Sequence, residues 1–232
     1  MLLQTVIDHL KTGEFSLENL GGNTDDGVTS NNTNAIINYI NLGLIDLYKR
    51  FNLSIKEIHL QQFAQIQKYT LSSKYALSNT SSDLVKYVID TSDDPFLNDI
   101  LLITGVYDEV GCELPLNDLN KPNSVFTPKY NVLQISYPKD ENSNTIIYRA
   151  APEMLIPNCD FKQEVPIPYT FLESLLLFIA SRFKASRPTQ ESMIESNNYY
   201  QKYIASIELI KTEGLFNSFM NTSTKLNERG FV

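Results

Sequence analysis

The chain has few of the residues from which common metal and thiol sites are built. It contains 2 cysteines and 2 histidines. Neither Cys112 nor Cys159 lies in a C-x-x-C motif, and two histidines cannot complete a zinc site of familiar spacing. We therefore expect two free thiols in a reducing compartment, no bound metal and no cofactor.

Long apolar runs are also missing. The longest, residues 175–180, is far shorter than the roughly 20 residues that a membrane-spanning helix needs. The first residues, MLLQTVIDHLK, lack a basic segment followed by an extended apolar core, so we expect no signal peptide. The glycine-rich motifs of the common nucleotide sites are absent as well.

The charge that is present is mostly negative. The formal net charge is −8, and residues 67–165 account for −6 of it, with 8 Lys/Arg against 14 Asp/Glu. Residues 1–66 carry −3 and residues 166–232 carry +1. An acidic surface repels duplex DNA, which argues against tight or sequence-specific DNA binding.

Helical periodicity marks both ends of the chain. Apolar residues at steps of three and four predict helices over residues 2–12 and 34–51, separated by loop chemistry over residues 21–33. The same pattern predicts helices over residues 168–186 and 190–215.

The short link between the last two helices favours an antiparallel pair. Pro188 interrupts the helical pattern there, and Thr189 is placed to cap the second helix. The apolar stripe expected on that helix is Met193, Tyr200, Ile204, Ile207 and Ile210.

Strand patterns fill the middle of the chain. Alternation and β-branched runs predict strands near residues 58–60, 69–71, 87–89, 100–106, 112–116, 130–137 and 145–150. The clearest hairpin joins residues 130–137 to 145–150, and a second joins 100–106 to 112–116.

This order predicts an α+β fold with an inserted antiparallel β domain. A helical bundle domain is expected from residues 1–56 and 166–216, built from the N-terminal helices and the C-terminal helix pair. The β-rich domain is expected over residues 57–165, and an extended C-terminal tail over residues 217–232.

No candidate for catalysis is strong. Ser181 and Lys184 match S-x-x-K, but the companion motifs of such enzymes are missing, so a solvated helix face is the favoured interpretation. His9 and His59 stand in no recognisable triad. The acidic residues fit no calcium loop, and turn formation is their expected role; they are Asp90, Asp93, Asp94, Asp99, Asp108 and Glu109.

The tyrosines of the last helix allow two interpretations. Tyr199 and Tyr203 are four residues apart and share a helix face, whereas Tyr200 belongs to the apolar stripe. One interpretation is packing in the core. The other is a lateral contact with another subunit, because tyrosine is enriched at interfaces.

Several stretches together resemble one protein family, the head-to-tail adaptor (connector) proteins of short-tailed phages, the tail tubular protein A-like group. The likeness covers nearly the whole chain through diffuse patterns. It is carried by residues 35–38 (AIIN), 47–51 (LYKRF), 94–109, 116–118 (LND), 124–126 (SVF), 168–183 with IASR at 179–182, 197–203 (NNYYQKY) and 226–232 (LNERGFV).

The resemblance implies a structural virion protein rather than an enzyme. Such a subunit forms a dodecameric ring beneath the capsid portal in the neck of the virion, after assembly in the host cytoplasm. It binds the portal protein and a downstream tail protein (nozzle or hub), and genome DNA passes through its channel without being read.

The resemblance also implies which residues make these contacts. The C-terminal tail of such adaptors docks into the portal, with Phe231 as an apolar anchor here. The portal-contact candidates are Asn221, Thr222, Lys225, Leu226, Asn227, Arg229, Phe231 and Val232. Tyr199 and Tyr203 are the subunit-interface candidates.

Two other functions remain open from the sequence. The first is a β-rich module that binds a glycan or a peptide through aromatics around Tyr107, Phe126 and Tyr130. The second is a hydrolase that uses Ser181 and Lys184 or the acidic residues of the β-rich segment.

Overall fold

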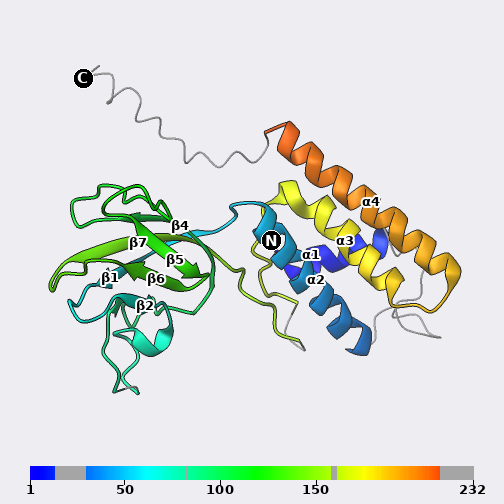
Figure 1. Ribbon diagram of the computed structural model, residues 1–232. Helices are drawn as coiled ribbons and strands as arrows, with labels where there is room; N and C mark the ends of the chain where they lie inside the picture. The colour runs from blue at the N-terminus through cyan, green and yellow to red at the C-terminus, as the bar shows by residue number, and fades with distance from the viewer. Residues whose placement is uncertain (14–29, 82, 158–160, 215–232) are drawn as a thin grey trace, which may run out of the picture. The chain divides into compact units, whose positions relative to one another are not determined.

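The computed structural model describes residues 1–13, 30–81, 83–157 and 161–214, and these have the expected α+β class (Figure 1). They form four α-helices and two antiparallel sheets. The chain divides into two compact units. The helical unit consists of residues 1–51 and the described residues from Glu153 onward, and the β unit consists of residues 52–152.

The helices lie close to where periodicity predicts them, with one difference. Their bounds are α1 Leu3–Thr12, α2 Ser30–Arg50, α3 Leu172–Ala185 and α4 Gln190–Thr212, and a 3-10 turn, η2 Tyr169–Phe171, precedes α3. Helix α2 begins at Ser30, so residues 30–33 are helical and not part of a loop. Serine, threonine and asparagine are frequent both in loops and at helix starts, so composition alone does not separate the two.

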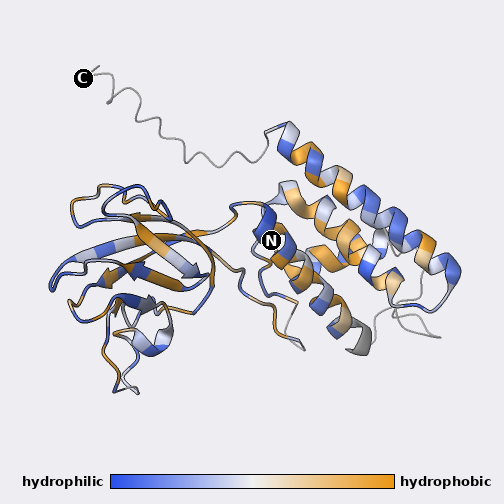
Figure 2. Cartoon of the chain, viewed as in Figure 1, coloured by the Kyte–Doolittle hydropathy of each residue, from blue (hydrophilic) through white to orange (hydrophobic). Residues whose placement is uncertain are grey.

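Helix α3 is the central element of the helical unit. It contacts α1, α2 and α4, and Figure 2 shows it as a predominantly hydrophobic helix. Gly43 lets α2 approach it closely: a Cβ at this position would lie 2.6 Å from Cδ1 of Leu175 and 3.1 Å from Cδ1 of Phe178. The core of this unit is therefore arranged around the side chains of α3.

The predicted antiparallel pairing of α3 and α4 is confirmed. Ser174 lies opposite Ser206, with 2.8 Å between their hydroxyl oxygens, and the hydroxyl of Ser196 donates to the carbonyl oxygen of Ser181 at 2.9 Å. The predicted cap is also confirmed, because Oγ1 of Thr189 accepts a hydrogen bond from the backbone N–H of Ser192 at 3.2 Å.

The connection that returns to the helices belongs to the helical unit. The Asn41 side chain bonds both the N–H (2.9 Å) and the carbonyl oxygen (3.0 Å) of Leu155. The N–H of Val165 donates to the carbonyl oxygen of Met1 at 2.7 Å. Residues 153–157 and 161–165 therefore belong to the helical unit, although the sequence placed them in the β-rich domain, and the β unit ends at residue 152.

The β unit contains two antiparallel sheets. Its elements are β1 Ile55–Gln61, β2 Lys68–Thr70, η1 Ser73–Tyr75, β3 Val88–Ile89, β4 Ile100–Tyr107, β5 Val125–Lys129, β6 Val132–Ile135 and β7 Ser143–Ala150. The strand orders are β3-β1-β7-β4 in one sheet and β2-β6-β5 in the other. One hydrophobic core contains residues from both sheets, among them Leu60 and Ile146 from the first and Tyr69 and Leu133 from the second.

The clearest hairpin predicted from the sequence is wrong. Strand β6 pairs with β2 and β5, whereas β7 pairs with β1 and β4 in the other sheet. Both strands bury one face in the shared core, which explains why both show the alternation. Alternation identifies the buried face of a strand, but it does not identify the strand's neighbour.

Two further strand predictions are corrected. Residues 112–116 form no strand and are joined to β4 only by an isolated bridge between Tyr107 and Glu113. The turn before them forms as expected, with Gly111 at φ +85°. Strand β5 was not predicted, because Pro128 and Lys129 give its second half the composition of a loop.

Candidate functional site

The predicted portal-contact residues lie outside the described residues. They are Asn221, Thr222, Lys225, Leu226, Asn227, Arg229, Phe231 and Val232. Cys159 also lies outside them, whereas Cys112 is an exposed free thiol. The portal contact therefore rests on the sequence alone.

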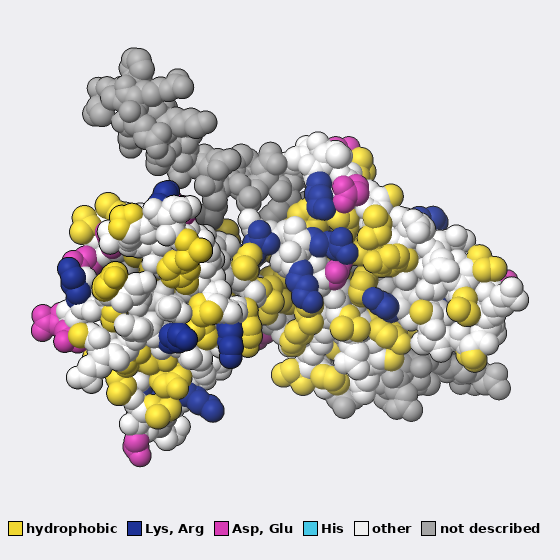
Figure 3. Space-filling model, viewed as in Figure 1, with side chains coloured by type: hydrophobic (Ala, Val, Ile, Leu, Met, Phe, Trp, Pro, Cys, Tyr) yellow, Lys and Arg dark blue, Asp and Glu magenta, His cyan; other side chains and the backbone are white. Residues whose placement is uncertain are grey.

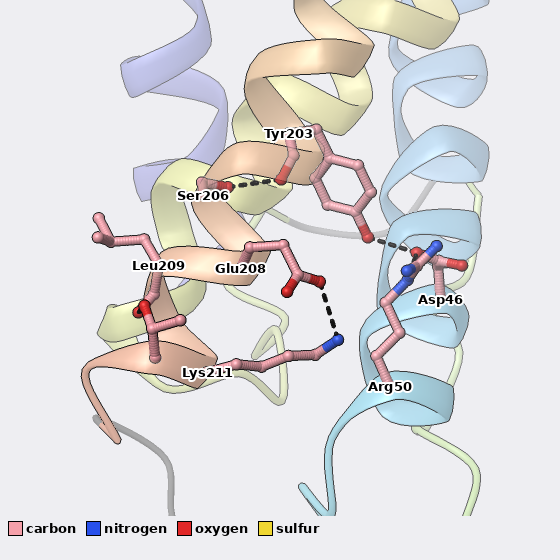
Figure 4. A network of polar contacts seen from close by, with 8 residues as sticks. Asp46, Arg50, Tyr203, Ser206, Glu208, Leu209 and Lys211 are labelled. Carbon is pink, nitrogen blue, oxygen red and sulfur yellow. Dashed lines mark hydrogen bonds and ion pairs between the residues drawn. The ribbon is translucent and has the colours of Figure 1, made fainter.

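Tyr203 is part of the core of its own subunit. Its side chain is fully buried, and its ring packs edge-on against Phe178 with 5.2 Å between the centroids. Its hydroxyl donates to the carboxylate of Asp46 on α2, which also accepts a hydrogen bond of 2.7 Å from Nε of Arg50 (Figure 4). Tyr203 thus has no exposed surface to offer a neighbouring subunit, which corrects the interface prediction for this residue.

The surroundings of Tyr203 keep its phenol protonated. Burial raises its pKa well above the ordinary value, and the hydrogen bond to Asp46 and the negative charge of that carboxylate raise it further. The phenol, the carboxylate and the Arg50 guanidinium form a polar contact between α2 and α4, two helices that are distant in the sequence. Its role is to fix how these helices pack.

Tyr199 remains a candidate for a contact with another subunit. Its side chain is half-buried, and the ammonium of Lys202 lies 5.6 Å from the centroid of its ring. A tyrosine that keeps part of its surface exposed can contribute both packing and a hydrogen bond at an interface.

Part of the apolar stripe predicted on α4 is exposed in the structure. Met193 is 62% exposed, Tyr200 is 38% exposed and Ile204 is half-buried. These three residues share one side of the helix because they are spaced by seven and four positions. We call them the α4 outer face. Figure 3 shows exposed hydrophobic side chains on the visible face of the helical unit.

The sequence predicted one apolar stripe that runs from Met193 to Ile210. The structure buries Ile207 and Ile210 of this stripe, on a neighbouring side of α4 that also includes Ser192, Ser196 and Tyr203. Small serines allow α4 to lie close to α3, so hydrophobicity alone did not identify the buried side. The apolar stripe is wider than the side of α4 that is buried. This extra width could have indicated from the sequence that α4 also carries an exposed apolar surface.

Ser181 and Lys184 are buried between α3 and α4, so the expected solvated face is wrong. The ammonium of Lys184 lies 2.5 Å from Oε2 of Glu195 on α4. The backbone carbonyl of Ser181 accepts a hydrogen bond from Ser196. Both side chains therefore serve the contact between the two helices.

The acidic residues of the β unit act mainly in turns. Asp90 accepts hydrogen bonds from the backbone and hydroxyl of Ser78 and from the N–H of Phe96. Burial opposes ionisation of Asp90, but these bonds outweigh it and lower its pKa. Asp108 accepts from the N–H groups of Val110 and Cys112.

No group of three or more potential metal-ligating side chains occurs among the described residues. The two histidines belong to different units. His9 is exposed in the helical unit, and His59 is exposed in the β unit with Nδ1 3.0 Å from the hydroxyl of Thr145.

The β unit has a surface groove of about 510 Å³ at one end of the two sheets. Phe126 and Tyr137 line it together with Lys121, Lys139 and Asp108. Of the three aromatics that suggested a binding module, only Phe126 is among the lining residues, and Tyr107 and Tyr130 are not. Tyr137 is 86% exposed and was not identified from the sequence.

No known protein family matches the sequence, and no curated protein matches it. In the described part of the chain, no helix is both long enough and apolar enough to span a membrane.

Proposed function

We propose that this chain is a structural virion protein, a head-to-tail adaptor whose subunits form a ring between the capsid portal and the tail. The observation that carries the proposal is the α4 outer face, an apolar helix surface exposed in the single subunit. The resemblance to the adaptor proteins of short-tailed phages supplies the identity of the assembly. The assembly is a virion neck, so the protein acts in the virion and not as an enzyme.

In this proposal the helical unit is a bundle domain and the β unit is inserted into it. The division of the chain supports this arrangement, because the β unit is one continuous segment between two parts of the helical unit. An inserted domain can contact a different partner from the domain that carries it. We assign ring formation to the helices and the contact with the downstream tail protein to the β unit.

Ring formation buries the α4 outer face against the next subunit. A head-to-tail interface that closes into a ring joins two different surfaces of the same protein. Met193 and Tyr200 suit the centre of such a surface, because methionine and aromatic residues are enriched at interfaces. Tyr199 lies on the same helix and contributes at its margin.

The charge of the chain suits a DNA conduit. A net charge of −8 weakens adhesion of a passing duplex, so the genome is retained and released without sequence-specific contacts. Residues 221–232 dock on the portal protein, with Phe231 as the apolar anchor and Arg229 as a charged contact.

The test is self-association of the full chain, measured by sedimentation velocity. Met193→Glu together with Tyr200→Glu places two charges in the proposed interface, so the wild type should form a closed oligomer and the double variant should remain monomeric. Ala205→Glu is the matched control, because Ala205 is exposed on another side of α4 and should leave the oligomer intact. Equal assembly of the wild type and the double variant would exclude this surface as the ring interface.

The groove of the β unit favours a second candidate function, a glycan-binding module. Aromatic rings beside charged and amide side chains, as with Phe126 and Tyr137 here, suit sugar faces and hydroxyls. A glycan array that gives no binding to the wild-type chain would remove this candidate.

A further inference from the structure

Strand β1 is paired along its full length on one side only. It pairs with β7 from Ile55 to Gln61, but with β3 only at His59 and Leu60. Beyond Ile89 the chain turns away, because the carboxylate of Asp90 binds Ser78 and the N–H of Phe96. The first half of β1 is therefore left without a neighbouring strand on this side.

The directions of the backbone hydrogen bonds identify which N–H and C=O groups of β1 have no partner strand. The N–H of Gln61 donates to the carbonyl oxygen of Tyr87 on the β3 side, at 2.8 Å, whereas Ser54 accepts from the N–H of Ala150 on the β7 side, at 3.0 Å. Backbone groups of an antiparallel strand alternate between its two sides. The N–H and C=O groups of Ile55 and Glu57 therefore face the open side, and no hydrogen-bond partner for them occurs within the described residues.

A groove of about 460 Å³ runs along this open edge. Its opposite wall is formed by the segment after β3, which includes Asp94, Pro95 and Leu97. Leu97 is 66% exposed. The groove thus lies where a further strand beside Ile55 and Glu57 would run.

The charge of the groove is negative. Glu57 and Asp94 both line it and are exposed. The cation of the groove, Lys56, is ion-paired with Asp99, with 2.6 Å between Nζ and Oδ2. An occupant that carries lysine or arginine therefore gains favourable charge contacts, whereas an acidic occupant is repelled.

The outer edge of the other sheet is less suited to pairing. In β5, the N–H of Thr127 donates to the side chain of Asn117 at 2.8 Å, and Pro128 has no N–H to offer. Strand β4, at the far edge of the first sheet, is interrupted by two register shifts in its pairing with β7. Irregular strands and prolines are two of the means by which sheet edges avoid pairing, and β1 has neither over residues 55–57.

We propose that the open edge of β1 binds an extended, basic segment of a partner protein as an added strand. The backbone of that segment exchanges hydrogen bonds with Ile55 and Glu57, and its lysine or arginine side chains approach Glu57 and Asp94. Leu97 and Pro95 contact the apolar side chains that alternate with them. This site does not depend on the ring proposed above, because all of its residues belong to the β unit.

The test uses amide hydrogen exchange of the full chain with synthetic ten-residue peptides. A peptide of alternating lysine and valine should slow exchange at Ile55 and Glu57, while Lys56 and Ile58, which face β7, should change little. Alternating glutamate and valine should have no effect. Alternating lysine and proline, which keeps the charge but loses half of the N–H groups, should bind much more weakly.

Variants of the chain distinguish the contribution of backbone hydrogen bonds to peptide binding from the contribution of side-chain charge. Glu57→Pro removes the open N–H without removing a bond to β7, so it should abolish binding of the lysine–valine peptide. Glu57→Gln and Asp94→Asn should each weaken that binding by about two- to fivefold, as expected for an exposed charge pair. In these variants the edge remains intact, so they test the proposal even if the proline variant fails to fold.

Three outcomes would overturn the proposal. The first is unchanged exchange at Ile55 and Glu57 at saturating lysine–valine peptide. The second is equal protection by the lysine–proline peptide, which would indicate charge attraction without strand pairing. The third is protection of these amides that rises with protein concentration in the absence of peptide, because the occupant would then be a second copy of this chain.

Discussion

Tyr203 illustrates how one residue can determine which surface a helix buries. Its phenol reaches Asp46 on α2, and its ring packs on Phe178 of α3, so it contacts two other helices of the unit. The sequence shows a tyrosine at helical spacing, but it cannot show a hydrogen-bond partner that is 157 positions away. For this reason core packing and subunit contact remained open for this residue until the structure placed Asp46 beside it.

Tyr203→Phe tests the polar contact between α2 and α4. The substitution keeps the ring and removes the hydroxyl, so the free energy of unfolding should fall by about 1.5–3 kcal/mol, the usual range for a hydrogen bond to a charged group. Chemical denaturation measures this change. Tyr130→Phe, at an exposed position of the β unit, is the control and should change stability by less than about 0.5 kcal/mol. A Tyr203→Phe variant as stable as the wild type would show that the bond to Asp46 contributes nothing.

Buried tyrosines should make the chain sensitive to alkali. Burial raises the pKa of Tyr69, Tyr87, Tyr148 and Tyr203 above the ordinary value of about 10. Above that pH the unfolded chain loses phenolic protons that the folded chain retains, so the unfolded state binds fewer protons. The contribution of these tyrosines to the free energy of unfolding should therefore be constant below about pH 10 and should fall as the pH rises further.

Denaturation at a series of alkaline pH values measures this effect. Tyr148→Phe should make the decline less steep, because Tyr148 then no longer contributes to the difference in bound protons. A stability that rises above pH 10 would contradict the direction of these pKa shifts.

At the scale of the element, periodicity predicted the helices well and the strand partners poorly. Helices α3 and α4 were predicted as a pair because a short link with Pro188 and Thr189 leaves few alternatives. Strand β7 was predicted as a strand but assigned to the wrong neighbour. Its true partners, β1 and β4, are both separated from it by other strands in the sequence, and alternation does not encode which distant strands complete a sheet.

The packing of α3 gives a matched pair of substitutions. Leu175 is fully buried and contacts the region of Gly43, whereas its neighbour Leu176 is only half-buried. Leu175→Ala should lower the free energy of unfolding by about 2–5 kcal/mol, the range for a leucine removed from a packed core.

Leu176→Ala should cost clearly less than Leu175→Ala. The two changes remove the same atoms from adjacent positions of one helix, so the difference between them reports burial alone. Chemical denaturation of both variants provides the comparison. Equal losses would mean that α3 does not present Leu175 to the core as described.

At the scale of the whole molecule, the proposed ring uses two surfaces, the α4 outer face and the C-terminal residues 221–232. The α4 outer face comes from the structure, because the sequence placed Met193 and Tyr200 in the same apolar stripe as the buried Ile207 and Ile210. The portal contact comes from residues 221–232 and from the resemblance to phage adaptors. Hydrophobic patterning could not separate the buried side of α4 from the exposed surface that we propose another subunit covers, since both are apolar and lie on the same helix.

Deletion of residues 225–232 tests the portal contact separately from the fold. If these residues serve the portal contact, as the resemblance to phage adaptors implies, the melting temperature should change little while binding to the portal protein is lost. Thermal denaturation and a pull-down with the portal protein of the same virion measure the two effects. A melting temperature lowered by many degrees would indicate instead that the tail packs on its own subunit.

The central claim is that this chain forms a ring that joins the portal to the tail. Electron microscopy of the purified full chain, mixed with the portal protein of the same virion, tests it most directly. We predict a closed, dodecameric ring of this chain bound to the portal. A chain that remains monomeric and separate from the portal, with residues 221–232 intact, would contradict the claim.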